Sequence, residues 1–331
     1  MTALPEFSIA GKTAVITGAS QGLGRGIAQV FAEAGVDLCI AARSLDKLSE
    51  AATALRRHGH KCIPVQADIT NAADVERLAA TAIKELGHVD ILINNAGIGV
   101  FKPMIPLPGF NPPTAKDLPN FFAPTSEEEW FRVINTNLTG AFLCMRALGP
   151  HMLSRRQGRV INISSANAAK AGRYRFSYDA SKAALSMLTR SMAVEWARYN
   201  INVTAIGSGY VETELIAENM ADPRLKEKLL AEIPMRRLGT EREVGLLAAY
   251  LAAPASAWLT GQTLFLDGGI LAELDRRAAS PPAAPYPAPL GGPAGRSPCY
   301  CLGPATLSPA CATASLPSCA ETRPPASCST R

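Results

Sequence analysis

The sequence predicts an α/β fold with a single doubly wound parallel sheet of about seven strands and helices on both faces. Two patterns carry this prediction. Short runs of β-branched and apolar residues alternate with helical patterns over residues 1–274, as in parallel sheets that are covered by helices on both sides. A glycine-rich turn also joins the first strand-like run to the first helical pattern, which is typical of the start of such a sheet.

The strands and helices follow one another at regular intervals. The first strand, Thr13–Thr17, precedes a helix over Leu23–Ala34 that ends at Gly35. Each later strand but the last is also followed by a helical segment, so the connections predict parallel neighbours. These later strands are Leu38–Ala42, Cys62–Gln66, Val89–Asn94, Arg159–Ser164, Asn202–Ile206 and Thr263–Leu266.

Three helix starts can be assigned from local signals. Thr125 to Glu128 has the spacing of a capping box, which would open an amphipathic helix running to about Ala147. Ser177 is the candidate start of a long helix further along. A helix is also expected over Asn71–Ala80, and Asp68 can be read as its N-cap.

Two segments depart from the βα pattern. Residues 101–124 carry seven prolines and four phenylalanines without periodicity, which predicts a long loop in an active-site or subunit contact, or else a mobile surface loop. Residues 275–331 are rich in Pro, Ala, Ser and Cys and predict a disordered tail, because a segment almost without large apolar residues cannot build a core. Residues 1–274 are expected to form one domain.

Charge, hydropathy and cysteine usage exclude several classes of protein and binding site. Residues 276–331 hold five Arg and one Glu, so they carry +4 of the formal +5 and leave the body near neutral. The body has no basic cluster interleaved with aromatic residues, so no nucleic-acid groove is expected. No long apolar stretch or basic leader is present, which predicts a cytoplasmic protein without a membrane segment. Cys39, Cys62 and Cys144 are expected to be buried thiols, and no metal site is expected.

The glycine-rich turn Thr17–Gly24 is the first candidate binding site. Free backbone N–H groups at the start of a helix bind the pyrophosphate of a dinucleotide, as in a Rossmann-type fold. Arg43 stands at the end of the second strand, where NAD binders place an acid and NADP binders tolerate an arginine. NADP(H) is therefore favoured and NAD(H) is possible. A surface arginine at the start of the next helix is the competing interpretation.

Tyr178 and Lys182 are the candidate acid–base pair. Residues four apart lie on one face of a helix, where an ammonium can acidify a phenol. Lowering a phenol pKa from near 10 to about 7 requires about 4 kcal/mol. One cation at about 4 Å in a partly dry cleft supplies about that much. The pair alone is weak because such pairs also occur on helix surfaces.

Six motifs together make the chain resemble a short-chain dehydrogenase/reductase over about Ile9 to Leu274. They follow the order of that family. The motifs are Thr17–Gly24, Asn94–Gly97, Asn135–Gly140, Asn162–Ser165, Tyr178–Lys182 and Leu266–Gly269.

The resemblance implies a catalytic tetrad of Asn137, Ser165, Tyr178 and Lys182. Tyr178 would exchange a proton with the substrate oxygen while hydride passes to or from a nicotinamide. Ser165 would hydrogen-bond that oxygen, and Ser164 is the less favoured candidate. Lys182 would lower the tyrosine pKa and hold the nicotinamide ribose, and Asn137 would hold a water that links Lys182 to solvent.

The resemblance also implies a set of cofactor contacts. Asp68 would contact the adenine, Asn95 and Gly97 would line the ribose side unless Asn95 stabilises a strand end, and Val211 and Thr213 would lie beside the carboxamide. The complete set is Gly18, Ser20, Gln21, Gly22, Leu23, Gly24, Arg43, Asp68, Ile69, Asn95, Ala96, Gly97, Tyr178, Lys182, Val211 and Thr213.

The sequence departs from the family in two places. Thr204 and Ser208 replace an Asn and a Pro, and the loss of the Pro puts the rigidity of the backbone beside the nicotinamide in doubt. The proline-rich segment makes the chain about twenty residues longer than most relatives there. Because it leaves the carboxyl end of a central strand, it is expected near the mouth of the active site.

The leading hypothesis is an NAD(P)-dependent oxidoreductase that acts on a carbonyl or secondary alcohol. Lys170, Arg173, Tyr174 and Arg175 suit a carboxylate, so a sugar acid or polyol is favoured, as in gluconate 5-dehydrogenase-like members, although these side chains can equally be solvated.

Two alternatives remain. One is a 3-oxoacyl-acyl-carrier-protein reductase. Tyr199 replaces a docking arginine of those enzymes, but Arg156 and Arg198 weaken that objection. The other alternative is a non-catalytic dinucleotide sensor.

The resemblance further implies a homodimer or homotetramer with the helices around Ser126–Leu148 and Tyr178–Arg198 at the two-fold axis.

Overall fold

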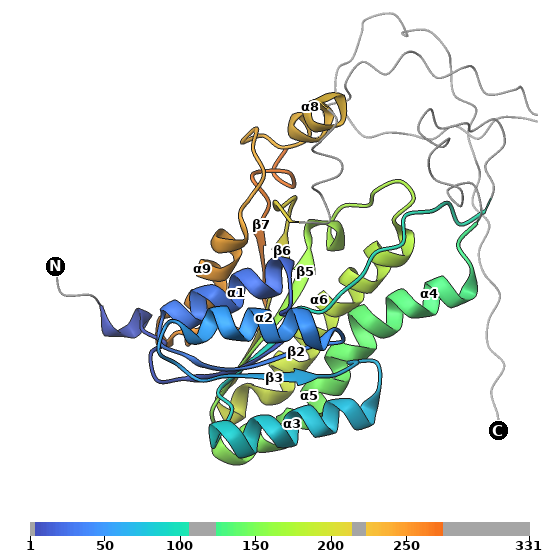
Figure 1. Ribbon diagram of the computed structural model, residues 1–331. Coiled ribbons are helices and arrows are strands. Elements are labelled where there is room, and N and C mark those ends of the chain that lie inside the picture. Colours follow the sequence, from blue (N-terminus) through green and yellow to red (C-terminus); the bar gives the residue numbers. More distant parts are fainter. Residues whose placement is uncertain (1–3, 106–123, 214–222, 274–331) are drawn as a thin grey trace, which may run out of the picture. The chain divides into compact units, whose positions relative to one another are not determined.

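A seven-stranded parallel sheet forms the centre of the structure, a computed structural model that describes residues 4–105, 124–213 and 223–273 (Figure 1). Its strand order is β3-β2-β1-β4-β5-β6-β7, which confirms the predicted fold class. The strands are β1 Thr13–Thr17, β2 Asp37–Ala42, β3 Cys62–Gln66, β4 Ile91–Asn94, β5 Gly158–Ser165, β6 Ile201–Ser208 and β7 Thr263–Leu266.

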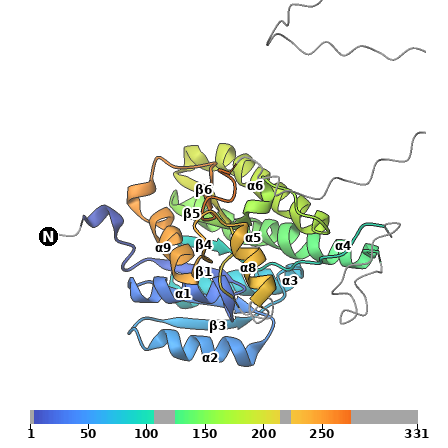
Figure 2. The same ribbon diagram turned by 90° about the horizontal axis from the view of Figure 1, so that it is seen from above.

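Helices cover both faces of this sheet (Figure 2). One face carries α1 (Gly22–Glu33), α2 (Leu45–Arg56) and α9 (Glu241–Ala252), and the other carries α3 (Ala72–Leu86), α5 (Gly140–Arg155) and α6 (Phe176–Trp196). Two shorter helices are α4 (Glu127–Ile134) and α8 (Pro223–Ala231). None of the helices described is long and apolar enough to cross a membrane.

The two helix layers create two hydrophobic cores. All five residues of β1 are buried, as expected for a strand covered on both faces. Its side chains alternate between the cores: Ile16 belongs to the cluster with α1, α2 and α9, whereas Val15 belongs to the cluster with α3, α5 and α6. Cys39, Cys62 and Cys144 are buried free thiols, as predicted.

Helices α1 and α9 pack unusually closely although they lie far apart in the sequence. A Cβ added at Gly26 would lie 2.4 Å from the Cβ of Glu241, so only glycine fits at this crossing. On the outside of the same contact, Arg242 Nη1 donates to Glu33 Oε2 over 2.6 Å. The first helix is thereby fixed by the last long one.

The start of α4 differs from the prediction by one residue. Ser126 is the N-cap: its hydroxyl accepts from the Glu129 N–H, and the Glu129 carboxylate accepts from the Ser126 N–H. The predicted box from Thr125 to Glu128 is therefore wrong. Thr125 instead donates its N–H to the Pro103 carbonyl over 2.9 Å.

The helical run that begins at α4 also continues further than predicted. It passes through a π-helical turn at Asn135–Thr139 into α5 and ends at Arg155 with Pro150 inside it, beyond the predicted end at about Ala147. Helix α3 likewise runs past the predicted Ala80 to Leu86, and Asn71 caps it. The interpretation of Asp68 as that cap is therefore wrong.

The chain divides into two units, Met1–Arg276 and Arg277–Arg331, and every described residue belongs to the first. The predicted disordered tail and residues 106–123 of the proline-rich segment lie outside the described residues. The start of that segment is described and borders the site.

Candidate active site

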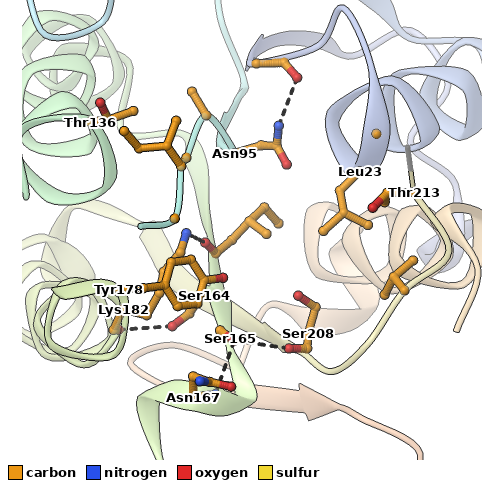
Figure 3. Close-up of a pocket in the computed structure, with 18 of the residues that line it drawn as sticks. Leu23, Asn95, Thr136, Ser164, Ser165, Asn167, Tyr178, Lys182, Ser208 and Thr213 are labelled. Atoms are coloured by element: carbon orange, nitrogen blue, oxygen red, sulfur yellow. Dashed lines mark hydrogen bonds between the residues drawn. The ribbon is translucent and has the colours of Figure 1, made fainter. Parts of the chain in front are cut away.

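A cavity of about 1560 Å³ lies at the carboxyl ends of the strands, where a doubly wound sheet binds its ligands. It brings together most of the residues predicted for the site. Figure 3 shows Tyr178, Lys182 and Ser165 on one side of it and Leu23 and Thr213 on the other. The predicted residues that line it are Gly18, Ser20, Gln21, Gly22, Leu23, Arg43, Asp68, Ile69, Asn95, Ala96, Gly97, Ser165, Tyr178, Lys182, Val211 and Thr213.

The β1–α1 turn has the conformation that a phosphate-binding turn needs. Gly18 and Gly22 have φ values of 65° and 57°, in the left-handed region that favours glycine. A Cβ at Gly24 would lie 2.3 Å from the Gly18 oxygen, so Gly24 serves the close packing of the turn and does not line the cavity. The N-cap Gln21 makes no side-chain cap. The N–H groups at the start of α1 therefore fit the pyrophosphate of a dinucleotide.

Asn95 holds this turn against β4. Its Nδ2 donates to the carbonyl oxygens of Thr17 and Gly18 over 2.9 and 3.1 Å. The Thr17 hydroxyl accepts from the N–H groups of Asn95 and Ala96 and donates to the Ile93 carbonyl. Asn95 thus fixes the glycine-rich turn and also lines the cavity, so both of its expected roles are compatible with its position.

The far end of the cavity, by the residues that follow β2 and β3, contains two cations. Arg43 is exposed and lines the cavity beside Lys47. Lys47 Nζ donates to Gln21 Oε1 over 3.3 Å, which ties α2 to the glycine-rich turn. Asp68 lines the same end and accepts from the Thr70 N–H and hydroxyl over 2.9 and 2.7 Å. Sequence reasoning missed Lys47, although its place one helical turn after Arg43 is a usable signal.

Lys182 is almost completely buried, with 4% of its surface exposed. Its Nζ donates to the Ile163 carbonyl over 2.7 Å and lies 5.7 Å from the centre of the Tyr178 ring. Burial lowers the pKa of Lys182 to about 8, because transfer out of water disfavours the charged form.

The electrostatics of Tyr178 differ from the expectation. Burial raises the pKa of Tyr178, and a side-chain hydrogen bond with Ser165 and the charge of Arg175 act in the lowering direction. Lys182 is not among the groups that act on this pKa in the structure described, so its expected lowering of the Tyr178 pKa stays a prediction. The Lys182 ammonium is itself desolvated and is directed to the Ile163 carbonyl.

The two serines at the end of β5 have different partners. Ser164 Oγ donates to the Lys182 carbonyl over 3.1 Å and lies 2.9 Å from Ser186 Oγ, so it joins β5 to α6. Ser165 Oγ accepts from the Asn167 N–H over 3.1 Å and lies within 3.5 Å of the Ser208 carbonyl, to which it donates (Figure 3). Ser165 is the one that lies beside the Tyr178 hydroxyl.

The substitution at Ser208 leaves an ordered backbone. Ser208 is the last residue of β6 and pairs in register with Ser165 of β5. The sheet ladder therefore fixes the backbone at this position even without a proline ring. Thr204, the other departure, is buried within the same strand opposite Ile161.

Asn137 lies in the π-helical turn between α4 and α5 and is 1% exposed. Its Oδ1 accepts from the Ile98 N–H over 2.8 Å, and its Nδ2 donates to the Ile98 carbonyl and to Ser181 Oγ over 2.9 and 3.0 Å. Asn137 does not line the cavity. It joins the segment after β4 to α6 one residue before Lys182, and its predicted contact with a water stays a prediction.

Phe101 and Tyr210 also line the cavity and were not predicted as site residues. Phe101 lies at the start of the proline-rich segment, and its ring contacts the Tyr178 ring with the centroids 6.2 Å apart. The segment therefore begins at the mouth of the site, as its departure from β4 predicted. Nothing local in the sequence marks either aromatic ring as a neighbour of Tyr178.

Comparisons with known proteins agree with this geometry. Residues 12–224 match the family model for short chain dehydrogenases. Oxidoreductase UcpA of Salmonella typhimurium is 39% identical over 269 residues, which cover 79% of this chain and 95% of the relative. The 3-oxoacyl-acyl-carrier-protein reductase FabG of Staphylococcus epidermidis is 32% identical over 260 residues, covering 78% and 98%.

A solved structure of a related enzyme has the same fold. A gluconate 5-dehydrogenase from Burkholderia cenocepacia, in complex with NADP and tartrate, superposes with a TM-score of 0.71 at 33% identity and covers 82% of this chain and 100% of that one. The protein is an oxidoreductase of alcohol and carbonyl groups that binds NAD(P), and the chain belongs to the short-chain dehydrogenase family.

Proposed function

We propose that the protein is an NADP(H)-preferring dehydrogenase or reductase whose substrate is a carboxylate-bearing polyol, such as a sugar acid. The observation that carries the proposal is the basic segment between β5 and α6. Lys170, Arg173 and Arg175 all line the cavity that Tyr178 and Ser165 also line. A cationic wall next to a candidate proton donor favours an anionic substrate.

The preference for NADP(H) is supported by the two cations at the far end of the cavity. Lys47 is hydrogen-bonded to Gln21, the N-cap of α1, and Arg43 lines the same cavity. Together they would hold a 2′-phosphate, for which a carboxylate in place of Arg43 would be repulsive. The bound nicotinamide supplies the hydride that the carbonyl carbon gains in reduction, or accepts it in oxidation.

The proton transfer is assigned to the chain's own residues. In reduction, Tyr178 gives its phenolic proton to the substrate oxygen, and in oxidation it takes that proton back. The Ser165 hydroxyl, which donates to the Ser208 carbonyl in the structure, would turn to donate its hydrogen bond to the substrate oxygen and orient it. Lys182, held through Ile163, is the group from which Tyr178 recovers a proton, and Asn137 keeps the backbone around Lys182 in place.

A 3-oxoacyl-thioester reductase is the second candidate. It is favoured by the similarity to FabG and by an exposed basic cluster outside the cavity. Arg156 and Arg198 both contact the Tyr199 ring, with guanidinium carbons 5.8 and 5.0 Å from the ring centre. Such a cluster suits docking of an acidic carrier protein.

We also propose a homodimer or homotetramer. Phe142 on α5 and Met187 and Val194 on α6 are 44%, 56% and 82% exposed. Apolar side chains along two neighbouring helices support a two-fold contact between them. Sedimentation of the purified protein tests this proposal.

The activity test is NADPH formation or consumption with two substrate pools, sugar acids with polyols and 3-oxoacyl thioesters, run with NAD(H) in parallel. We expect turnover with the first pool and NADP(H). Turnover with thioesters alone would favour the second candidate, and turnover with NAD(H) alone would contradict the assignment of Arg43 and Lys47.

A further inference from the structure

Four side chains from separate parts of the chain form a row of contacts at the end of the cavity that contains Tyr178. Phe101 follows β4, Arg175 directly precedes α6, Tyr210 follows β6, and Glu232 follows α8. All four line the cavity. Arg175 is the central member because it contacts both aromatic rings.

The guanidinium of Arg175 is held in a defined place. Its Cζ lies 5.4 Å from the centre of the Phe101 ring and 5.7 Å from the centre of the Tyr210 ring. Its Nη1 donates to the Tyr210 hydroxyl over 3.3 Å, and that hydroxyl donates to Glu232 Oε2 over 3.0 Å. A planar guanidinium between aromatic rings is pre-organised, so little conformational entropy is lost when it binds an anion.

Most of the hydrogen-bonding capacity of Arg175 remains available. A guanidinium has five N–H donors. Within residues 4–105, 124–213 and 223–273, the Tyr210 hydroxyl is the acceptor found for Arg175, and no carboxylate lies within ion-pair distance of it. Arg175 is half-buried. Its guanidinium therefore has N–H groups available for a bidentate pair with a carboxylate.

Arg175 is also coupled to the reacting group. The Phe101 ring that Arg175 covers also contacts the Tyr178 ring at 6.2 Å. The positive charge of Arg175 acts to lower the pKa of Tyr178, so its field reaches the phenol. An anion bound at Arg175 would therefore place the rest of a small substrate beside the Tyr178 hydroxyl.

The other cations of this wall differ from Arg175 in one respect. Lys170, Arg173 and Lys228 line the cavity but are exposed. Solvent screens an exposed charge and makes its pairing weak, whereas a partly desolvated arginine with fixed geometry binds a carboxylate more strongly. Among the cations of the described wall, Arg175 combines partial burial with a fixed orientation.

We propose that Arg175 is the specificity-determining residue of the substrate site and binds the carboxylate of a hydroxy or oxo acid through the N–H groups that Tyr210 leaves free. The inference rests on the proposed function, because it assigns one residue to the carboxylate of that substrate class. Phe101 and Tyr210 act as positioning residues that hold the guanidinium.

The test uses two probes that differ at one carbon, D-gluconate and its neutral counterpart D-glucitol. The variant is Arg175→Met, which removes the charge and retains a long side chain. We expect the ratio of kcat/KM for gluconate to that for glucitol to fall by roughly thirtyfold or more, as for removal of one partner from a desolvated charge pair. Arg57→Met, the matched control at an exposed cation that does not line the cavity, should change the ratio less than about threefold. A purely structural role of Arg175 would lower both rates together, and an unchanged ratio would overturn the inference.

Calorimetric titration of gluconate into the enzyme with NADP bound separates this inference from the proposed function. One outcome is that the wild-type protein binds gluconate without turnover and that Arg175→Met abolishes this binding. In that case Arg175 is the carboxylate anchor, and the proposed reaction is wrong. If the wild-type protein does not bind gluconate, or if Arg175→Met binds it equally well, the anchor is wrong.

Arg175→Lys keeps the test decisive if the methionine variant does not fold. The lysine retains the charge and loses the planar fork, so the selectivity ratio should fall by an intermediate amount, about tenfold. Affinity for NADPH should be unchanged in every variant that folds, because Arg175 belongs to the substrate end of the cavity. A ratio that stays at the wild-type value in Arg175→Lys, with gluconate affinity also unchanged, would count against a bidentate contact.

Discussion

Lys182 donates its hydrogen bond to the backbone carbonyl of Ile163, 2.7 Å away. The bond joins α6 to the middle of β5, so the ammonium is held by a neutral oxygen. No ion pair found in the described part of the chain includes Lys182. The protein therefore buries this cation at a cost that its pKa of about 8 reflects.

That burial predicts a pH dependence of stability in the cofactor-free protein. The pKa of Lys182 is lowered from 10.5 to about 8 on folding, so the unfolded chain binds more protons between these values. The free energy of unfolding should then rise with pH through this window, by about 3 kcal/mol for this residue. Urea denaturation at several pH values from 7.5 to 10.5 measures it, with Lys182→Met as the reference.

Subtracting the Lys182→Met curve removes contributions from other groups. The raised pKa of Tyr178 acts with the opposite sign, because the folded protein then retains a proton that the unfolded chain loses. A wild-type curve parallel to that of Lys182→Met would show that Lys182 is not desolvated.

Tyr178→Phe removes the proposed proton donor and leaves the ring. The rate should fall by about 10²–10⁴, the range for general acid–base catalysis. NADPH affinity, measured by fluorescence titration, should stay within a few-fold of the wild-type value. Residual activity at the wild-type level would refute the assignment of Tyr178.

The neighbouring serines provide a matched pair of variants. Ser165→Ala removes a donor to the substrate oxygen and should lower kcat by roughly a hundredfold. Ser164→Ala breaks the contacts with the Lys182 carbonyl and Ser186, so it should cost about 1 kcal/mol of stability and little activity. The reverse pattern in steady-state kinetics and thermal melting would exchange their roles.

Cofactor preference should depend on Arg43. Arg43→Ala removes a charged partner of the 2′-phosphate and should raise the KM for NADP about tenfold or more, while the KM for NAD changes little. Arg57→Ala is the control, because Arg57 is exposed at the other end of α2 and does not line the cavity. Equal effects of Arg43→Ala on both cofactors would argue against a phosphate contact.

Asp179 positions the loop between β5 and α6. It accepts from Asn167 Nδ2 over 2.6 Å and from the Gly172 N–H over 2.8 Å. Asp179→Asn places an amide donor against one of these donors and should raise the substrate KM about tenfold without changing the affinity for NADPH. Asp46→Asn, at an exposed position of α2, is the control. A matching loss of NADPH affinity in Asp179→Asn would indicate general disruption instead.

Much of the fold could be predicted from local patterns. The strand Thr13–Thr17 matches the structure because a parallel strand buried on both faces has a nearly continuous run of apolar and β-branched residues. The start of α4 was wrong by one residue because both Thr125 and Ser126 can cap, and the Pro103 carbonyl engages Thr125. The π-helical turn has no comparable local signal.

The site was predictable where a motif spans a few residues and less so where distant segments meet. The glycine-rich turn and the Tyr178–Lys182 pair are of the first kind. The contacts of Arg175 with Phe101 and Tyr210 are of the second kind, because three separate loops supply them. The direction of the Tyr178 pKa also depends on burial, which residue spacing does not reveal.

The close crossing of α1 and α9 has a consequence for how the chain folds. The Arg242–Glu33 pair joins residues 209 positions apart, and Gly26 leaves no space between the two helices. Contacts of such long range form late, because the entropy of closing the intervening chain must be overcome first. A nascent chain that stops before residue 241 therefore has the glycine-rich turn in its sequence without the helix that braces it, and we expect nucleotide affinity to emerge only after nearly the whole domain has been synthesised.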